Sequence, residues 1–215
     1  MSADDDNPYL TEEDLRKISD RYRLAWAATV CDRIMGLYSP YFRATYRFQE
    51  AIDFAWNVAL GTPWSHENWE ELICFIQDQE SAIESDGYNE NVLYSPIGLL
   101  LEVKFANIKA AEQAVDYATI AFAEHQIYRQ GVCERDDVVP EDYYLELSVP
   151  AYAFAKKLYS RIAVPNPPTI HRHWFDDEIL DMTYSPLPLE IIQNKSIDPP
   201  EHETRHISAL YSSHK

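Results

Sequence analysis

The feature that most constrains the fold is a pair of apolar stripes near the start of the chain, each repeating at intervals of three or four residues. Residues at this spacing share one face of an α-helix. The first stripe contains Leu15, Ile18, Tyr22, Trp26, Val30, Ile34 and Leu37, and the second contains Phe48, Ile52, Ala55 and Ala59. Gly36 and Ser39-Pro40 lie between them, where one helix ends and another begins. The pattern predicts a hairpin of two helices, from about Thr11 to Leu37 and from about Pro40 to Leu60.

Further helices are predicted along the next hundred residues or so. A third should run from about Ser65 to Ser85, and Ser95-Pro96 should open the next, because proline favours the first helical position. Helical spacing then continues to Gln130, either as one helix or as two joined near Asn107. The alanines between 110 and 123 allow neighbouring helices to approach closely, which predicts a central position for this segment.

The C-terminal third is richer in proline. We interpret residues 133–147 as a loop and Ser148-Val149-Pro150 as the start of a helix that Val164 and the following prolines end. A short helix over Asp176–Met182 is possible on this pattern, and the remainder reads as an extended strap or tail. The sequence therefore predicts an all-α fold, a single bundle of about five to seven helices with a proline-rich C-terminal extension. The expected division is a bundle domain over 1–165 and a strap or tail over 166–215.

Composition bounds the class of protein. A chain of 215 residues suits one domain with a sizeable core, and 5 Gly against 15 Tyr favour aromatic helix contacts over glycine-rich phosphate loops. The N-terminus has no secretory signal pattern, and no apolar run approaches the roughly 20 residues that span a bilayer. Cys31, Cys74 and Cys133 form no CxxC pair. We expect buried, reduced thiols in a cytoplasmic protein that does not contact membrane.

Charge is the most distinctive bulk property. The formal net charge is −18, and the segment from Phe48 to Val103 contains no Lys or Arg. It holds eleven acids: Glu50, Asp53, Glu67, Glu70, Glu71, Asp78, Glu80, Glu84, Asp86, Glu90 and Glu102. Such a field repels nucleic acid and attracts a basic partner.

The same helical segments carry a resemblance to a known family. Residues 27–34, AATVCDRI, followed by Tyr38 and then by residues 51–56, AIDFAW, resemble a small all-helical bacterial family with the pattern Cys-Glu-Arg-Leu-(Leu)-Pro-x-Tyr and Leu-Asp-x-Ala-Trp. This family includes immunity proteins that neutralise polymorphic toxins. Asp32 replaces the family's Glu, and Gly36 stands near its Pro. The resemblance implies a class of function, and it leaves the toxin partner unspecified.

Two histidine patterns suggest metal chemistry. His202-Glu203-Thr204-Arg205-His206 is formally an HExxH motif, but Asp198-Pro199-Pro200 precedes it and no apolar run leads into it. We interpret it as a chance match. His171 and His173 lie two residues apart beside Trp174, with no other mark of a metal site. We expect neither metal nor cofactor, and a metal-dependent hydrolase using these histidines remains an alternative.

Three polar residues stand on otherwise apolar helices. Asp32 and Arg33 lie on the first predicted helix, and Asp53 lies on the second. They either form a functional site between the two helices or form an interhelical ion pair that fixes their register. We favour the ion pair, because polar groups beside a dense apolar stripe need partners.

The predicted function is that of an immunity protein without enzymatic activity, which occludes the active or substrate-binding surface of a cognate toxin. A helical scaffold or oligomer with no toxin partner is a further alternative, and the oligomeric state is left open. Acidic charge without nearby bases and turn-exposed tyrosines predict the contact residues. They are Asp78, Glu80, Glu84, Asp86, Tyr88, Glu90, Glu141, Asp142, Tyr143 and Tyr144.

Overall fold

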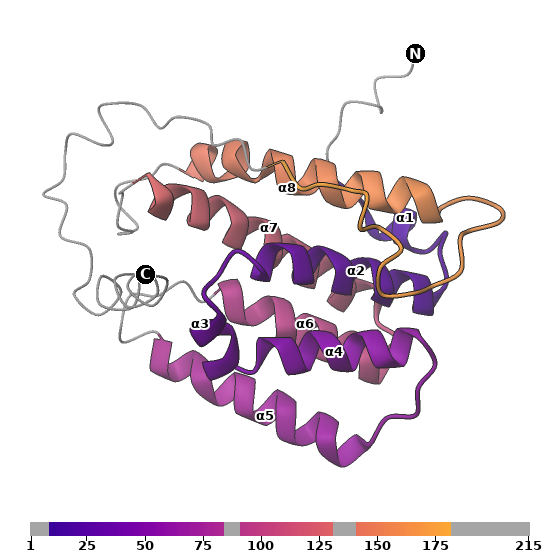
Figure 1. Cartoon of the computed structure of the whole chain (residues 1–215), viewed down its shortest axis with the longest axis horizontal. Helices are drawn as coiled ribbons and strands as arrows, with labels where there is room; N and C mark the ends of the chain where they lie inside the picture. The colour runs from indigo at the N-terminus through magenta and orange to yellow at the C-terminus, as the bar shows by residue number, and fades with distance from the viewer. Residues whose placement is uncertain (1–8, 84–90, 131–140, 182–215) are drawn as a thin grey trace, which may run out of the picture.

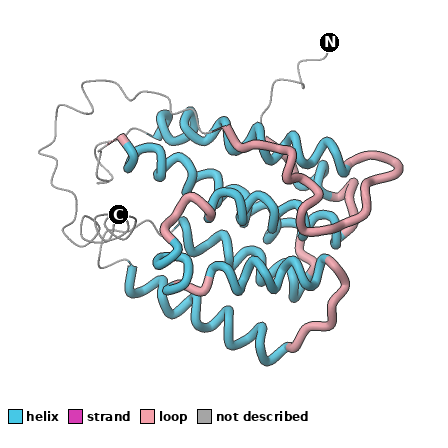
Figure 2. Tube along the Cα trace, in the orientation of Figure 1, coloured by secondary structure: helices cyan, strands magenta, loops and turns pink. Residues whose placement is uncertain are grey.

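The computed structural model describes residues 9–83, 91–130 and 141–181, and these residues form a bundle of eight helices without a strand (Figures 1 and 2). The helices are α1 (Glu12–Leu15), α2 (Asp20–Met35), α3 (Pro40–Thr45), α4 (Phe48–Ala59), α5 (His66–Ile83), α6 (Asn91–Phe105), α7 (Ile108–Arg129) and α8 (Glu141–Ile162). The all-α prediction is confirmed. There are more helices than the predicted five to seven, because each helix of the predicted hairpin is broken in two.

The breaks have local causes. Thr11 caps α1 by accepting a hydrogen bond from the Asp14 backbone N–H, but the chain leaves the helix after Arg16, and Ser19 is extended before α2 begins. Between α3 and α4, Arg47 adopts a left-handed backbone with φ of 53°. Its guanidinium pairs with Glu50 and with Glu71 of α5, at 2.7 and 2.9 Å. The first apolar stripe continues from Leu15 through Ile18 to Tyr22 across the break before α2, so the sequence pattern conceals that break.

Two prolines predicted to start helices lie inside them instead. Pro96 is within α6 and Pro150 is within α8, so both starts were placed too late. Most residues within a turn of each proline are buried, although Val149 beside Pro150 is 42% exposed, and this packing keeps the helix continuous despite the missing backbone N–H. These buried neighbours are Val92, Leu93, Ile97 and Leu99 in α6 and Leu147, Ser148 and Ala151 in α8.

Helix α7 occupies the centre of the bundle, as its alanines predict. It packs against α2, α6 and α8, with Ala111, Ala114 and Ala118 fully buried (Figure 1). Its start at Asn107, whose side chain accepts from the Lys109 N–H at 3.1 Å, resolves the open question in favour of two helices, α6 and α7. Gly98 of α6 marks the closest approach, since a Cβ there would lie 2.8 Å from the Ala114 Cβ.

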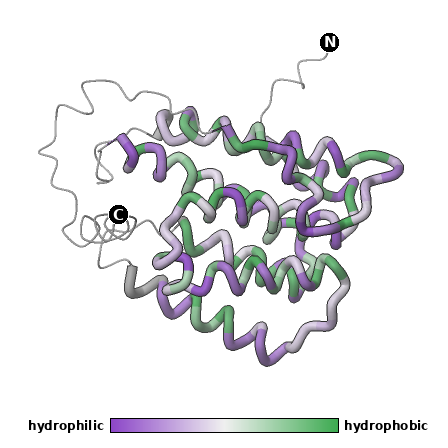
Figure 3. The backbone as a smooth tube through the Cα atoms, viewed as in Figure 1, coloured by the Kyte–Doolittle hydropathy of each residue, from purple (hydrophilic) through white to green (hydrophobic). Residues whose placement is uncertain are grey.

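Helix α5 and helix α8 form opposite edges of the bundle (Figure 1). Along α5, hydrophobic and hydrophilic residues alternate with the helical period (Figure 3). Trp69, Leu72, Ile73 and Ile76 are buried on its inner side. One side of α5 is therefore fixed to the bundle while the other faces outward.

A buried ion pair ties α2 to α6 and to the turn before α7. Arg23 and Glu102 are each 2% exposed and lie 3.0 Å apart. The same guanidinium donates to the carbonyl of Ala106 at 3.0 Å, and Ala106 has a left-handed backbone with φ of 47°. Leaving either charge buried without the other would be costly.

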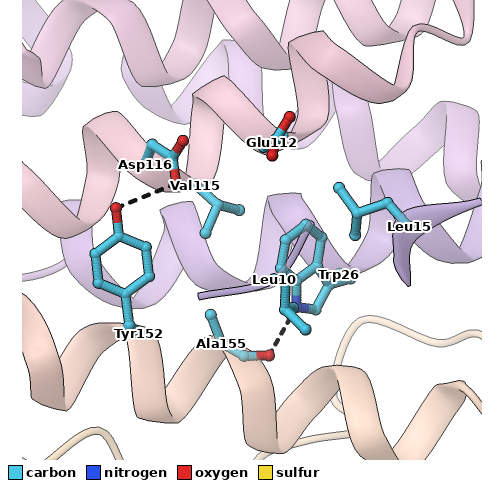
Figure 4. Close-up of a pocket in the computed structure, with 8 residues that line it drawn as sticks. All are labelled: Leu10, Leu15, Trp26, Glu112, Val115, Asp116, Tyr152 and Ala155. Atoms are coloured by element: carbon cyan, nitrogen blue, oxygen red, sulfur yellow. Dashed lines mark hydrogen bonds between the residues drawn. The ribbon is translucent and has the colours of Figure 1, made fainter. Parts of the chain in front are cut away.

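A second polar contact joins α7 to α8 in the interior. The Tyr152 hydroxyl donates to the Asp116 carboxylate at 3.2 Å, near the Trp26 indole, which donates to the Ala155 carbonyl (Figure 4). Burial raises the pKa of Asp116 to about 6; the Tyr152 hydrogen bond lowers it, and Glu112 raises it further. The fold therefore favours the protonated carboxyl.

We expect Gly98→Ala to lower the free energy of unfolding by about 1–3 kcal/mol, because the new methyl group overlaps Ala114 and forces α6 away from α7. Ala106→Gly, the reverse exchange a few residues away, should leave stability unchanged or raise it by up to about 1 kcal/mol, since glycine accepts a positive φ. Urea denaturation measures both. If both variants changed the free energy of unfolding equally, the close approach of α6 to α7 at Gly98 would be contradicted.

Asp116 should make stability depend on pH. The pKa of Asp116 in the folded protein lies above the ordinary 3.8, so the protonated carboxyl is the form that the fold favours. Its contribution to stability is fully present below pH 3.8 and is lost as pH rises through about 6. Asp116→Asn should exceed the parent in unfolding free energy by on the order of 1–3 kcal/mol at pH 8, with the difference vanishing near pH 4. Tyr152→Phe should steepen the loss, because it removes the donor that favours the charged form. Denaturation curves with identical pH dependence in the parent and Asp116→Asn would contradict this assignment.

Candidate functional site

After α8, residues 163–181 run back over the bundle without forming a helix, and we call this segment the strap (Figure 1). The predicted end of the last helix near Val164 is confirmed, whereas no helix forms over 176–181. Three apolar side chains of the strap, Trp174, Phe175 and Leu180, are buried against the bundle. The Tyr22 hydroxyl of α2 also donates to the Pro168 carbonyl at 2.9 Å. Apolar burial thus fixes the strap to α2.

Ion pairs hold the strap at three further places. Arg33 of α2 pairs with Asp176 at 2.9 Å, and Asp53 of α4 pairs with Arg172. Near the end of α8, Lys157 and Arg161 both pair with Glu178. The prediction that Arg33 and Asp53 pair with each other across the two N-terminal helices is therefore wrong. Each of them pairs instead with a residue of the strap.

These contacts enclose a pocket of about 460 Å³ between α2, α4 and the strap, which we call the strap pocket. Its volume falls in the range typical of small-ligand sites. It is lined by Thr29, Asp32, Arg33, Trp56, Arg172, His173, Phe175 and Asp176. The structure thus brings together two sets of residues that the sequence suggested separately, the polar residues of the hairpin and the histidine-containing segment after the prolines.

Asp32 is the unusual member of this lining. Its side chain is half-buried, yet it makes no hydrogen bond or ion pair within the part of the chain that the structure describes. Burial raises the pKa of its carboxyl, against the opposing charges of Arg172, Arg43 and Arg33 and with added repulsion from Asp53. The arginines are close enough to act electrostatically without donating a hydrogen bond to it.

The second candidate surface is the outward side of α5. Glu67, Glu70, Glu71, Cys74 and Asp78 are all exposed there and recur at helical spacing, and we call them the α5 acidic face. Glu71 pairs with Arg47, and Glu70 lies 3.3 Å from the His66 imidazole. Glu67 and Asp78 make no ion pair within the described residues.

The base-free segment of the sequence is not a base-free surface. Arginines from outside the segment reach into it: Arg47 pairs with Glu50 and Glu71, and Arg23 pairs with the buried Glu102. Arg172 pairs with Asp53 in the same way. The negative surface that remains among the described side chains is centred on the outward side of α5.

The structure separates the predicted contact residues. Asp78 is exposed on α5, and Glu80 lies in the same helix, although its side chain is outside the described set. Glu84, Asp86, Tyr88 and Glu90 lie outside the described residues. Glu141 and Asp142 begin α8, their side chains again not described. Tyr143 and Tyr144 are half-buried within α8, so the prediction that they are exposed on a turn is wrong. Because α5 and α8 lie at opposite edges of the bundle, Asp78 and these tyrosines do not belong to one surface (Figure 1).

The predicted metal-binding histidines are partly described. His171 and His173 are exposed, and the His173 Nδ1 lies 3.0 Å from an Asp176 oxygen. Across 9–83, 91–130 and 141–181, no three His, Cys, Asp or Glu side chains are grouped so that they could hold a metal ion. His202 and His206 lie outside these ranges.

The cysteine prediction is confirmed at one position and wrong at another. Cys31 is buried, and burial raises the pKa of its thiol, whereas Cys74 is exposed on α5. The α5 stripe places Cys74 on the outward side, beside Glu71 and Asp78 in the helical order. Cys133 lies outside the described residues.

A scan against protein-family models finds no match, and searches of the curated proteins and of the solved structures find none either. Among the described residues, no helix combines the length and the apolar character needed to cross a membrane. Function is therefore inferred below from the chain's own surfaces.

Trp174→Ala should detach the strap, because it removes a strap side chain that is only 6% exposed against the bundle. We expect a loss of about 3–5 kcal/mol in unfolding free energy and faster proteolysis within 163–181. Ile179→Ala is the matched control, since Ile179 is an apolar strap residue that is 83% exposed. Similar proteolysis of the two variants would show that apolar burial does not hold the strap.

Proposed function

We propose that this chain is an immunity protein, which binds a bacterial toxin domain and neutralises it by covering its active or substrate-binding surface. The observation that carries the proposal is the α5 acidic face, a row of exposed carboxylates on an edge helix whose inner side is buried in the bundle. The resemblance of residues 27–34 and 51–56 to a family containing immunity proteins supports the same class.

The position of α5 favours binding to a macromolecule. Packing of Trp69, Ile73 and Ile76 against the bundle fixes the backbone of α5 before any partner arrives. A preformed face loses little conformational entropy on association, which leaves more of the contact energy for affinity.

The chemistry of the face favours a basic partner. Glu67 and Asp78 have no ion-pair partner within the described residues, and the whole chain carries a net charge of −18. Opposite charge accelerates association and discriminates against acidic competitors.

An aromatic residue suited to anchoring stands at the start of α5. Trp64 is 38% exposed, and its ring lies 6.0 Å from that of Phe54 and 6.2 Å from that of His66. Leu60, on the same connection between α4 and α5, is 40% exposed. Tryptophan is enriched among the residues that contribute most to protein interfaces, and Trp64 lies two residues before α5 begins.

The direct test is to co-express the chain with the C-terminal domain of any large secreted protein whose gene adjoins its own, scored as rescue of growth. Purified partners then allow association rates to be compared between two double variants with the same charge change. Glu67→Lys with Asp78→Lys alters the α5 acidic face, and Glu13→Lys with Glu146→Lys alters exposed positions on α1 and α8.

We expect the α5 pair to slow association about tenfold or more at low salt, with the difference shrinking near 0.5 M salt as charges are screened. The α1 and α8 pair should bind at nearly the parental rate. Failure to rescue growth with any adjacent toxin domain, or equal slowing by both pairs, would contradict the proposal.

A further inference from the structure

One acid of the strap pocket has no hydrogen-bond or ion-pair partner among the residues that the structure describes. Its other charged groups are engaged: Arg33 with Asp176 and with the Phe175 carbonyl, and Arg172 with Asp53. The His173 imidazole also lies within 3.0 Å of Asp176. Asp32 alone among the charged lining residues has no hydrogen bond or ion pair within the described part of the chain.

The electrostatic surroundings of Asp32 are balanced. The charged groups around it are Arg33 on its own helix, Arg43 of α3, Asp53 of α4, and Arg172, His173 and Asp176 of the strap. With His173 neutral, Asp32 and these groups comprise three acids and three arginines. The net charge around the pocket therefore does not decide which ligand binds. The Asp32 carboxylate decides it, because no described residue donates a hydrogen bond to it.

The Asp32 carboxylate is half-buried and has no hydrogen-bond donor among the described residues, so a ligand N–H would supply a hydrogen bond that these residues do not. The missing element is thus a group with N–H donors and a positive charge. An anion would have to displace Asp176 or Asp53 from the arginines that they already occupy, and it would face Asp32 as a like charge.

We propose that the strap pocket receives a basic side chain, arginine or lysine, from the protein partner, with the Asp32 carboxylate as its counter-ion. The assignment of the source rests on the proposed function, because a toxin domain attracted by an acidic surface presents such side chains. The site itself is defined by this chain's own residues.

The rest of the lining suits such a side chain. Trp56 from α4 and Phe175 from the strap also line the pocket but are each only 1% exposed, so the surface that a ligand would meet is mainly polar. The volume of about 460 Å³ accommodates one long side chain together with water. An arginine, with five N–H donors in a plane, is better matched than a lysine to a carboxylate, with which it can form two parallel hydrogen bonds.

The binding test uses the full chain and three blocked amino acids, N-acetyl-arginine amide, N-acetyl-lysine amide and N-acetyl-glutamate amide. Amide chemical shifts of α2 and the strap are followed by NMR during titration. We expect saturable binding of the arginine compound with Kd on the order of 1 mM, weaker binding of the lysine compound and none of the glutamate compound.

Asp32→Asn removes the charge with little change in shape and should weaken binding of the arginine compound at least tenfold. Glu146→Gln, at an exposed position on α8, is the matched control and should bind as the parent does. Unchanged binding to Asp32→Asn, binding of the glutamate compound in place of the arginine compound, or no shift changes at tens of millimolar would each overturn the assignment.

A second measurement separates this inference from the proposed function. With a neutralised toxin in hand, Asp32→Asn should accelerate dissociation about tenfold while leaving the association rate nearly unchanged. If the toxin is neutralised and both rates are unaffected, the proposed function stands and the pocket assignment fails. If the arginine compound binds through Asp32 but no toxin is neutralised, the cation site stands and the proposed function fails.

Discussion

The fold depends on the close approach of α6 and α7. Gly98 allows it from one side and the alanines of α7 from the other, with Ala114 at the point of contact. Because α7 also packs against α2 and α8, its small side chains determine the spacing of the whole bundle. The larger residues Trp26, Phe48, Trp56 and Phe122 then fill the volume around this narrow centre.

Ion pairs do not set the spacing of the bundle, but they hold the strap in place on its surface. Arg33 and Asp53 hold the strap against α2 and α4, and the strap in turn completes a pocket that neither helix forms alone. On the other edge, packing of α5 through one side leaves its carboxylates outward. Both candidate surfaces thus belong to elements whose backbone is already fixed, which favours recognition without a large ordering cost.

The sequence predicts the helices well and their ends less well. Apolar spacing identifies every long helix, and the alanine pattern correctly places α7 at the centre, because both signals are local. The breaks at Ser19 and Arg47 were missed, since Leu15 and Ile18 are both buried although the chain is not continuously helical between them. Pro96 and Pro150 misled the assignment of helix starts, because burial of their neighbours outweighs one lost hydrogen bond.

The candidate sites were predictable only in part. Asp32, Arg33 and Asp53 stand out as polar residues on apolar helices, but their partner Arg172 carries no signal of its own in the sequence. The pairing arises from the path of the strap, which joins residues more than a hundred positions apart. In the same way, the base-free run overstated the acidic surface, because Arg23, Arg47 and Arg172 reach it from elsewhere in the fold.

Under the proposed function, this chain contacts another protein through two preformed surfaces, the α5 acidic face and the strap pocket. Hydrogen–deuterium exchange of the chain alone and in complex with a toxin domain tests it most directly. We expect slower exchange in α5 and across 163–181 in the complex, with the central helix α7 unchanged. Unaltered exchange in both of these segments, with protection confined to other parts of the surface, would contradict it.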